Sequence, residues 1–457
     1  MPEEAWQVEI VSGPHAGQCM AMQAGTVRIG RAATNDVVLA EDATVSGHHA
    51  LLSCRHGAWT IEDCGSKNGT FIDNGERRVR IAGVTLVHAG QCFFLGSAGL
   101  RIVSAAARPA ARAPSQGLTL RVEFAAEELR YHLWSLAATG TQYSCACGLE
   151  ELNTLQRRVL GAVAAQHASS TGSALDEVAQ VLVQHLFPAR LVERLAEMQG
   201  DALVISHPPA LFGLPWELLP IGDVPLGVRM PLARQVVLND QSIARCAALE
   251  GRPRWLIIAN PTGDLPETQA TAETLLDQLV ARQPDASVAF VAGERATRLD
   301  LLKRLETADI VYYTGHAAHD PADPPASGWR LRDGRLTGRD FGKLRRVPAF
   351  VFANACESGR EIVNTSGRLD ADSSAGLAGS LLLAGVRHYL GTQWPVAVGP
   401  AALFGQAVLD RLLQGEEVAV AVQQARRTVW QFCPADPAWA AYTLFGDPAW
   451  RLPDVSE

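Results

Sequence analysis

The sequence predicts a multidomain chain, in which an all-β sandwich is followed by an α/β domain with a mostly parallel sheet flanked by helices. Up to about residue 104, short apolar-alternating runs are separated by Gly, Asn and Asp clusters, a pattern typical of β-sandwiches. Further along, amphipathic stretches long enough for helices alternate with short apolar runs, as in α/β folds. The length of 457 residues also exceeds what one hydrophobic core usually serves.

The amino-acid composition indicates which kinds of binding partner and which cellular compartment to expect. The net charge of −8 gives no electrostatic reason to expect nucleic acid or an anionic membrane. The acidic start, MPEEAWQVEI, does not have the pattern of a signal peptide, and no run approaches about 18 uncharged apolar residues. Nine scattered cysteines, an odd number, favour reduced thiols over a disulfide framework. We therefore expect a cytoplasmic protein that binds neither membrane nor nucleic acid.

Strands are expected in the first half wherever the alternation recurs, at 6–11, 26–30, 36–40, 49–55, 58–63, 69–74, 84–87 and 92–96. Three loops between them carry polar side chains: Gly30-Arg31, the run Ser46-Gly47-His48-His49, and GSKNGTF at 65–71. Loops at one end of a sandwich can converge. A guanidinium and a hydroxyl there suit a phosphate group, and an Asn amide can hold a peptide backbone.

Each of these loops alone has an ordinary structural explanation, since Gly-Arg is common after a strand and Asn-Gly is a typical hairpin turn. Their order and spacing together resemble the forkhead-associated (FHA) domain, a phosphothreonine-binding β-sandwich, over about residues 5–104. The resemblance implies that a phosphothreonine-containing protein is a partner. It assigns phosphopeptide-binding roles to Arg31, Ser46, Lys67 and Asn68, and a structural role to His49. Gly47 departs from the polar residue often found there, which removes one possible contact.

Residues 105–118 are dominated by Ala, Pro, Arg, Ser and Gly, and we interpret them as a linker. Beyond the linker, helices are expected at 151–166, 174–200, 268–283 and 400–431. Strands are expected between them, at 201–206, 254–260, 287–291, 309–315, 348–355 and 388–394.

Two of these strands end in reactive side chains: DIVYYTGH ends at His316, and PAFVFANAC ends at Cys356. If the strands are parallel neighbours, both residues emerge at the carboxyl edge of the sheet, where functional groups collect. An imidazole there can take the proton of a thiol and leave a nucleophilic thiolate. Small residues nearby, such as Ser358 and Gly359, would let a peptide backbone approach and leave amide groups for an oxyanion.

A lone cysteine is more often a small core residue than a nucleophile. However, Cys356 precedes Glu-Ser-Gly, which is typical of a turn. The ordered set GLPWELLP (213–220), the Gly-His strand end, ACESG (355–359), LLLAGVRHYLGTQWPV (381–396) and WAAYTLFGDP (439–448) resembles the CHAT domain, a caspase- and separase-like cysteine peptidase family. The resemblance implies a caspase-like fold, with His316 as general base and Cys356 as nucleophile. It also implies an oxyanion hole formed by the backbone amides of Gly315 and Cys356.

The resemblance also identifies candidates for the substrate pocket, Asn354, Glu357 and Trp394. Relatives that cut after Arg or Lys have an acid two residues before the cysteine or after the tryptophan. This chain has Asn354 at the first position, and Ala397 and Val398 at the second. A guanidinium buried without a partner is costly, so we expect a neutral residue before the cleaved bond, with Glu357 still a candidate to reach the pocket.

No cofactor or metal is expected. Cys145-Ala-Cys147 is an isolated pair, and a zinc site needs more ligands. The expected domains are FHA at 1–104, linker at 105–118 and CHAT at 119–457. We expect a phosphothreonine-guided cysteine endopeptidase that cleaves a protein substrate, and family resemblance points to cell death or defence signalling in bacteria. The alternative is a catalytically silent, phospho-dependent adaptor.

Overall fold

The computed structural model describes residues 6–12, 19–22, 25–40, 42–55, 58–73, 78–87, 92–104, 118–135, 138–168, 173–198, 202–237, 252–356, 358–359 and 376–453. The chain divides into two compact units, Met1–Ala113 with Glu273–Pro284, and Pro114–Ala272 with Asp285–Glu457. The predicted linker lies outside the described residues, except for Leu118, which begins a strand.

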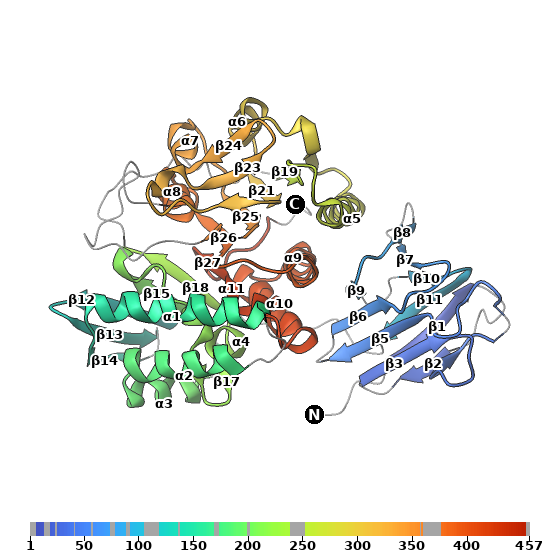
Figure 1. Ribbon diagram of the computed structural model, residues 1–457, viewed down its shortest axis with the longest axis horizontal. Coiled ribbons are helices and arrows are strands. Elements are labelled where there is room, and N and C mark those ends of the chain that lie inside the picture. Colours follow the sequence, from blue (N-terminus) through green and yellow to red (C-terminus); the bar gives the residue numbers. More distant parts are fainter. Residues whose placement is uncertain are drawn as a thin grey trace. The chain divides into compact units, whose positions relative to one another are not determined.

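The N-terminal strands form two sheets, as the sequence predicts (Figure 1). The first has the order β2 (Cys19–Met22), β1 (Trp6–Ser12), β11 (Ala98–Ser104), β10 (Cys92–Leu95), β7 (Thr70–Asp73) and β8 (Arg78–Arg80). The second has the order β4 (Val37–Val38), β3 (Gly25–Gly30), β5 (Ala50–Arg55), β6 (Ala58–Asp63) and β9 (Thr85–Val87). Inward-facing residues of both sheets share one core, including Val8 and Phe93 from the first and Ile29 and Leu52 from the second.

The second unit is built on one mixed sheet of eleven strands. Their order is β14 (Ala138–Ala146), β13 (Glu128–Ser135), β12 (Leu118–Ala125), β15 (Leu203–His207), β18 (Leu232–Val236), β27 (Tyr442–Phe445), β26 (His388–Thr392), β25 (Phe350–Asn354), β21 (Ile310–Thr314), β19 (Arg254–Ala259) and β20 (Ser287–Ala292). Pairing is parallel except at β12–β13, β13–β14 and β26–β27, so the mostly parallel sheet is confirmed.

The helices of this half of the chain are α1 (Leu149–Ala168), α2 (Ser173–Leu186), α3 (Ala189–Glu197), α4 (Leu226–Arg229), α5 (Pro266–Arg282), α6 (Arg298–Leu305), α7 (Gly338–Lys343), α8 (Leu377–Ala384), α9 (Val398–Leu413), α10 (Val418–Phe432) and α11 (Ala438–Ala441). Smaller elements include the 3₁₀ helix η2 (Trp216–Leu218) and a two-stranded sheet of β16 (Pro220–Ile221) and β17 (Val224–Pro225). A three-stranded sheet is formed by β22 (Ala317–Ala318), β23 (Gly328–Leu331) and β24 (Gly334–Thr337). No helix in the described ranges has the length and apolar character needed to cross a bilayer.

The two faces of the sheet are covered by different helices because side chains alternate along a strand. On β25, Val351 faces the core cluster that contains Leu301 of α6 and Leu381 of α8. Phe352 points the other way, and its ring meets Phe404 of α9 at 6.4 Å between ring centroids. Asn354 has the same parity as Phe352, so this strand delivers its last polar side chain to the α9 face.

Candidate functional site

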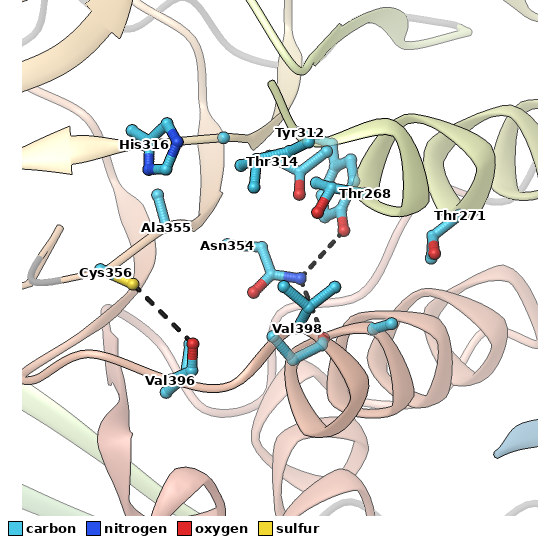
Figure 2. A pocket seen from close by; sticks show the side chains of 14 residues that line it. Thr268, Thr271, Tyr312, Thr314, His316, Asn354, Ala355, Cys356, Val396 and Val398 are labelled. Carbon is cyan, nitrogen blue, oxygen red and sulfur yellow. Dashed lines mark hydrogen bonds between the residues drawn. The ribbon is translucent and has the colours of Figure 1, made fainter. Parts of the chain in front are cut away.

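His316 and Cys356 leave the sheet side by side. Strands β21 and β25 are parallel neighbours, and Thr314 lies opposite Asn354 in their register. His316 and Cys356 each follow two residues later, and neighbouring strands lie about 4.8 Å apart. Figure 2 shows both side chains on the same edge of one pocket.

The turn after Cys356 is fixed to the next strand, β26. The Ser358 hydroxyl donates to the Ala353 carbonyl (2.9 Å) and accepts from the Thr392 amide (3.1 Å). The Gly359 amide donates to the Thr392 carbonyl (2.7 Å), and a Cβ on Gly359 would lie 3.1 Å from the Gly391 backbone. The expectation that these small residues make room for a substrate is therefore wrong: both are buried, and they pack the turn after Cys356 against β26.

The pocket beside Cys356 has a volume of about 210 Å³. Three regions line it: the ends of β21 and β25, the start of α5 with Leu265, Thr268 and Thr271, and the start of α9 with Val396, Val398, Ala401 and Ala402. Among the described residues that line it, none is a carboxylate, a lysine or an arginine. The Cys356 thiol points toward the Val396 carbonyl, with 3.9 Å between sulfur and oxygen (Figure 2).

Asn354 lies at the base of this pocket, as a buried and fully engaged amide. Its Nδ2 donates to the Tyr312 hydroxyl (3.1 Å) and to the Ala401 carbonyl (3.0 Å), and its Oδ1 accepts from the Tyr442 hydroxyl (2.6 Å). Because both amide hydrogens are used, this environment suits a neutral Asn, and a carboxylate here would face the Ala401 carbonyl.

The structure does not place the other two predicted pocket residues, Glu357 and Trp394, in the lining of the Cys356 pocket. Glu357 lies outside the described residues. Trp394 is buried, and it borders a separate, smaller cavity with Gln156 and Pro215. It is not among the described residues that line the Cys356 pocket, so its placement there is corrected: it lies with residues of α1 and of the segment before η2.

Asp264 is a site residue that the sequence analysis missed. Its Oδ2 lies 3.0 Å from Nε2 of His316. It belongs to the loop that follows β19, the strand next to β21 in the sheet. The sequence shows that Asp264 follows an apolar strand, since RWLIIA precedes the polar run NPTGD, but it does not show the contact with His316.

Three other cysteines in the described part of the chain are held as thiols. Burial raises the pKa of Cys147 to about 12, and burial also raises the pKa values of Cys145 and Cys64. Cys145 donates its S–H to the Leu186 carbonyl at 3.1 Å. These side chains therefore give little thiolate at neutral pH.

In the N-terminal unit, the loops after β3 and before β5 are joined along their backbones. The Arg31 amide donates to the Ser46 carbonyl (2.9 Å) and the Ala32 amide to the Gly47 carbonyl (3.0 Å). Gly30 permits this approach, since a Cβ there would lie 2.4 Å from the Gly47 carbonyl oxygen. The Arg31 side chain is exposed, and no described carboxylate pairs with it.

The third loop joins the same cluster. The Lys67 amide donates to the Ser46 hydroxyl oxygen (3.0 Å), which leaves the hydroxyl hydrogen free to donate to an incoming oxygen. Nδ2 of Asn68 donates to the Thr44 carbonyl (2.7 Å). The four predicted phosphopeptide-binding residues therefore come from three loops that are hydrogen-bonded to one another. The side chains of Arg31, Lys67 and Asn68 are exposed, and Ser46 is half-buried.

His49 and Asp63 support these loops from below. Nδ1 of His49 accepts from the Ser46 amide (3.0 Å), so Nε2 carries the proton and donates to the Gly69 carbonyl (3.1 Å). Burial lowers the pKa of His49 and keeps it neutral. Burial alone would raise the pKa of Asp63, but hydrogen bonds from Thr70 and Ser66 outweigh it and hold the pKa below its ordinary value.

Comparison with known proteins separates the same two regions. Residues 176–447 match the family model of the CHAT domain, and residues 9–106 match the model described as inner membrane component of T3SS, cytoplasmic domain. The Saccharomyces cerevisiae separase–securin complex solved at 3.0 Å resolution aligns over 73% of this chain and 30% of that chain, with 12% identity and a TM-score of 0.51. The α/β domain therefore has a separase-like fold.

The N-terminal region is similar to FHA domain-containing proteins, among other relatives. FhaB of Mycolicibacterium smegmatis is 39% identical over 72 residues, which are 16% of this chain and 46% of that protein. The oxoglutarate dehydrogenase inhibitor of Corynebacterium diphtheriae is 31% identical over 80 residues, 18% of this chain and 55% of that protein. A solved FHA domain of the Chlamydia trachomatis protein CT664 is 26% identical over 22% of this chain and 99% of that chain, with a TM-score of 0.20.

The match spans about half the length of these two curated relatives, and only 17% of an FHA domain-containing protein of Arabidopsis thaliana. The N-terminal region is FHA-like, and the domain that follows is α/β and separase-like.

Proposed function

Because this chain belongs to the CHAT domain family, we propose that it is a cysteine endopeptidase that a phosphothreonine mark directs to its protein substrate. One observation carries the catalytic part of this proposal. The register of β21 and β25 carries an imidazole and a thiol to the same edge of the sheet, beside a pocket.

The proposed reaction is acyl transfer to Cys356. His316 takes the thiol proton, and the thiolate attacks the carbonyl carbon of the scissile peptide bond. The backbone amides of Gly315 and Cys356 donate to the oxyanion that forms. When the C–N bond breaks, the imidazolium returns its proton to the leaving amine. Water then attacks the thioester while His316 takes its proton, and the carbon–sulfur bond breaks to release the acid and restore the thiol.

The residue before the cleaved bond is proposed to be neutral and mainly apolar. The described lining of the pocket offers no charge to pair with a lysine, arginine or carboxylate of the substrate, and Asn354 is bound to its own neighbours. A cavity of about 150 Å³ can hold a benzene ring, so about 210 Å³ accommodates a Leu, Met or Phe side chain.

The FHA region at 1–104 is proposed to bind the phosphothreonine through Arg31 and Ser46, with Asn68 and Lys67 on the peptide. The segment 105–118 would tether it to the CHAT domain at 119–457 and raise the local concentration of substrate. The reaction is proposed to occur in a cytoplasm, since a nucleophilic cysteine must stay reduced.

The decisive experiment compares the full chain with Cys356→Ala. Both proteins are incubated with candidate phosphoproteins, with and without phosphatase treatment, and new N-termini are identified by mass spectrometry. The proposal expects new termini only with the wild-type chain, and fewer after dephosphorylation. If phosphopeptides bind but neither protein produces new termini, the adaptor function replaces the peptidase.

A further inference from the structure

We propose that Asp264 is a positioning residue of the candidate active site, which it completes as a Cys356–His316–Asp264 triad. This inference rests on the proposed peptidase function and adds a residue to it. The carboxylate Oδ2 lies 3.0 Å from Nε2 of His316, which is hydrogen-bond distance.

The loop that carries Asp264 is held in an unusual conformation. Asn260 has a φ of 45°, in the left-handed region, and it is buried. The backbone amide of Asn260 donates to the Thr314 carbonyl at the end of β21 (2.8 Å), and its side-chain Oδ1 accepts from the backbone amide of Leu265 (3.0 Å). Gly263, with a φ of 81°, donates its amide to the Asn260 carbonyl (3.0 Å). A conformation of this kind persists only where its surroundings hold it, and such positions gather at functional sites.

The same loop presses against the backbone before His316. A Cβ on Gly315 would lie 2.9 Å from Cδ of Pro261, so glycine permits the approach. The Thr262 hydroxyl donates to Oδ1 of Asp264 and leaves Oδ2 for the imidazole. Hydrogen bonds made by Thr262 and Leu265, the residues that flank this part of the loop, therefore orient the Asp264 carboxylate toward His316.

This contact assigns each ring nitrogen of His316 a role. With Nε2–H donating to the carboxylate, Nδ1 carries the lone pair that can take the thiol proton. Once the ring is protonated, the adjacent carboxylate stabilises the imidazolium and so favours the thiolate form of Cys356. The carboxylate orients the base and does not itself contact the substrate.

Two other ionisable residues have described contacts at this corner. The Tyr313 hydroxyl and the Arg330 amide both donate to the His316 carbonyl, at 2.5 and 2.8 Å. Burial raises the pKa of Tyr313 well above its usual value, so its phenol remains neutral. Both contacts are made to the main-chain carbonyl of His316. Among the described residues, Asp264 is the carboxylate that contacts the imidazole ring itself.

The test measures the rate at which iodoacetamide alkylates Cys356 in the full chain between pH 5 and 9, with the modified residue located by mass spectrometry. This readout needs no substrate, and it reports the thiolate fraction directly. The variants are Asp264→Ala, Asp264→Asn and His316→Ala, with Asp285→Asn as the control. Asp285 is an exposed carboxylate paired with Arg252, so the control removes one surface charge elsewhere.

We expect Asp264→Ala to slow alkylation at pH 6 about tenfold and to move the midpoint up by about one pH unit. Asp264→Asn, which keeps a hydrogen-bond acceptor without charge, separates orientation of the ring from stabilisation of the imidazolium. The inference is overturned if Asp264→Ala matches wild type while His316→Ala is slow. If His316→Ala also matches wild type, the proposed dyad itself is wrong. Thermal unfolding of each variant checks that it is folded.

Discussion

At the residue scale, Arg31 combines a fixed backbone with an exposed guanidinium. Its amide is bound to the Ser46 carbonyl, so the side chain starts from a defined point beside the Ser46 hydroxyl. A fork of N–H donors and a hydroxyl can then meet one phosphate together, and hydrogen bonds to charged groups contribute about 1.5–3 kcal/mol each.

We therefore expect Arg31→Ala to abolish the preference for a phosphothreonine peptide over its unphosphorylated form in isothermal calorimetry, a loss of about tenfold or more. The control is Arg28→Ala, which removes the same charge from an exposed pair with Asp36. A phosphopeptide that binds Arg31→Ala as tightly as wild type would contradict the assignment.

Glu217 shows how a single buried charge can support the fold. It follows Trp216 in the turn η2 and pairs with Arg234, and Arg426 lies 3.6 Å from the same carboxylate. All three charged side chains are buried. Burial lowers the pKa of Arg426 to about 10, while the charge of Glu217 opposes that shift.

Glu217→Gln would leave two buried guanidinium groups without their counter-charge. We expect it to lower the free energy of unfolding by about 3–5 kcal/mol, measured by urea denaturation. Glu197→Gln breaks an exposed pair with Arg194 and should change stability by no more than about 1 kcal/mol. Equal effects of the two substitutions would show that the buried network adds nothing.

At the element scale, helix α9 determines one wall of the pocket. Its first residue, Val398, is 38% exposed and lines the Cys356 pocket. Further along, Gly405 lets the helix approach the sheet, since a Cβ there would lie 2.9 Å from Nδ2 of Asn354. The start of this helix is therefore the place where a charge can enter the pocket without disturbing the buried amide.

We expect Val398→Asp to accept a substrate arginine. An acid in the first turn of a helix is favoured by the helix dipole, so the variant should fold. A peptide probe ending in arginine should label Cys356 at least about tenfold faster in Val398→Asp than in wild type. The Val398→Asn variant has a side chain of nearly the same shape as Val398→Asp but without its charge, so its labelling by the arginine probe should not be faster than in wild type. Strong labelling of wild type by the arginine probe would instead show that the neutral pocket is wrong.

Sequence patterns predicted the elements best where one periodicity was unbroken. The strands that end at His316 and Cys356 lie where they were expected, because apolar runs followed by small polar turns are distinctive. Two long predicted helices are each divided. Pro188 precedes α3, and Gly415, with a φ of 80°, follows α9. The apolar spacing continues through both breaks, so periodicity alone did not show them.

The candidate site could be predicted only in part, because a strand-end position can be read locally but contacts between loops cannot. Sequence order placed His316 and Cys356 at neighbouring strand ends. It could not reveal that the loop after β19 turns back on His316, which depends on the left-handed Asn260. Nor could it show that Trp394 packs away from the pocket.

At the scale of the whole molecule, buried histidines set how stability depends on pH. Burial lowers the pKa of His207 to about 3 and that of His388 to about 4. An unfolded histidine has a pKa of about 6.5, so below that value the unfolded chain binds more protons than the folded one. The stability that these two histidines contribute to the α/β domain is therefore nearly complete above about pH 6.5 and declines as the pH falls toward 4.

We expect each of these histidines to remove about 2 kcal/mol from the free energy of unfolding between pH 7 and pH 5, measured by denaturant titration. His388→Gln should reduce this loss, because it removes one titrating group. Carboxyl groups with a lowered pKa, such as Asp309, lose their contribution below about pH 5 and so act outside this interval. Stability that is unchanged from pH 7 to 5 would contradict the prediction.

The large sheet has one narrow seam. Strands β18 and β27 pair at a single position, Arg234 with Phe445, whereas β21 and β25 pair at five. In native-state hydrogen exchange, the Gly446 amide, which donates to the Arg234 carbonyl (3.0 Å), should open before the amides of β25. The chain enters this sheet through β12, on the far side of the seam from Cys356. The position where the sheet is joined by the fewest pairs therefore lies between β12, where the chain enters this sheet, and β25, which precedes Cys356.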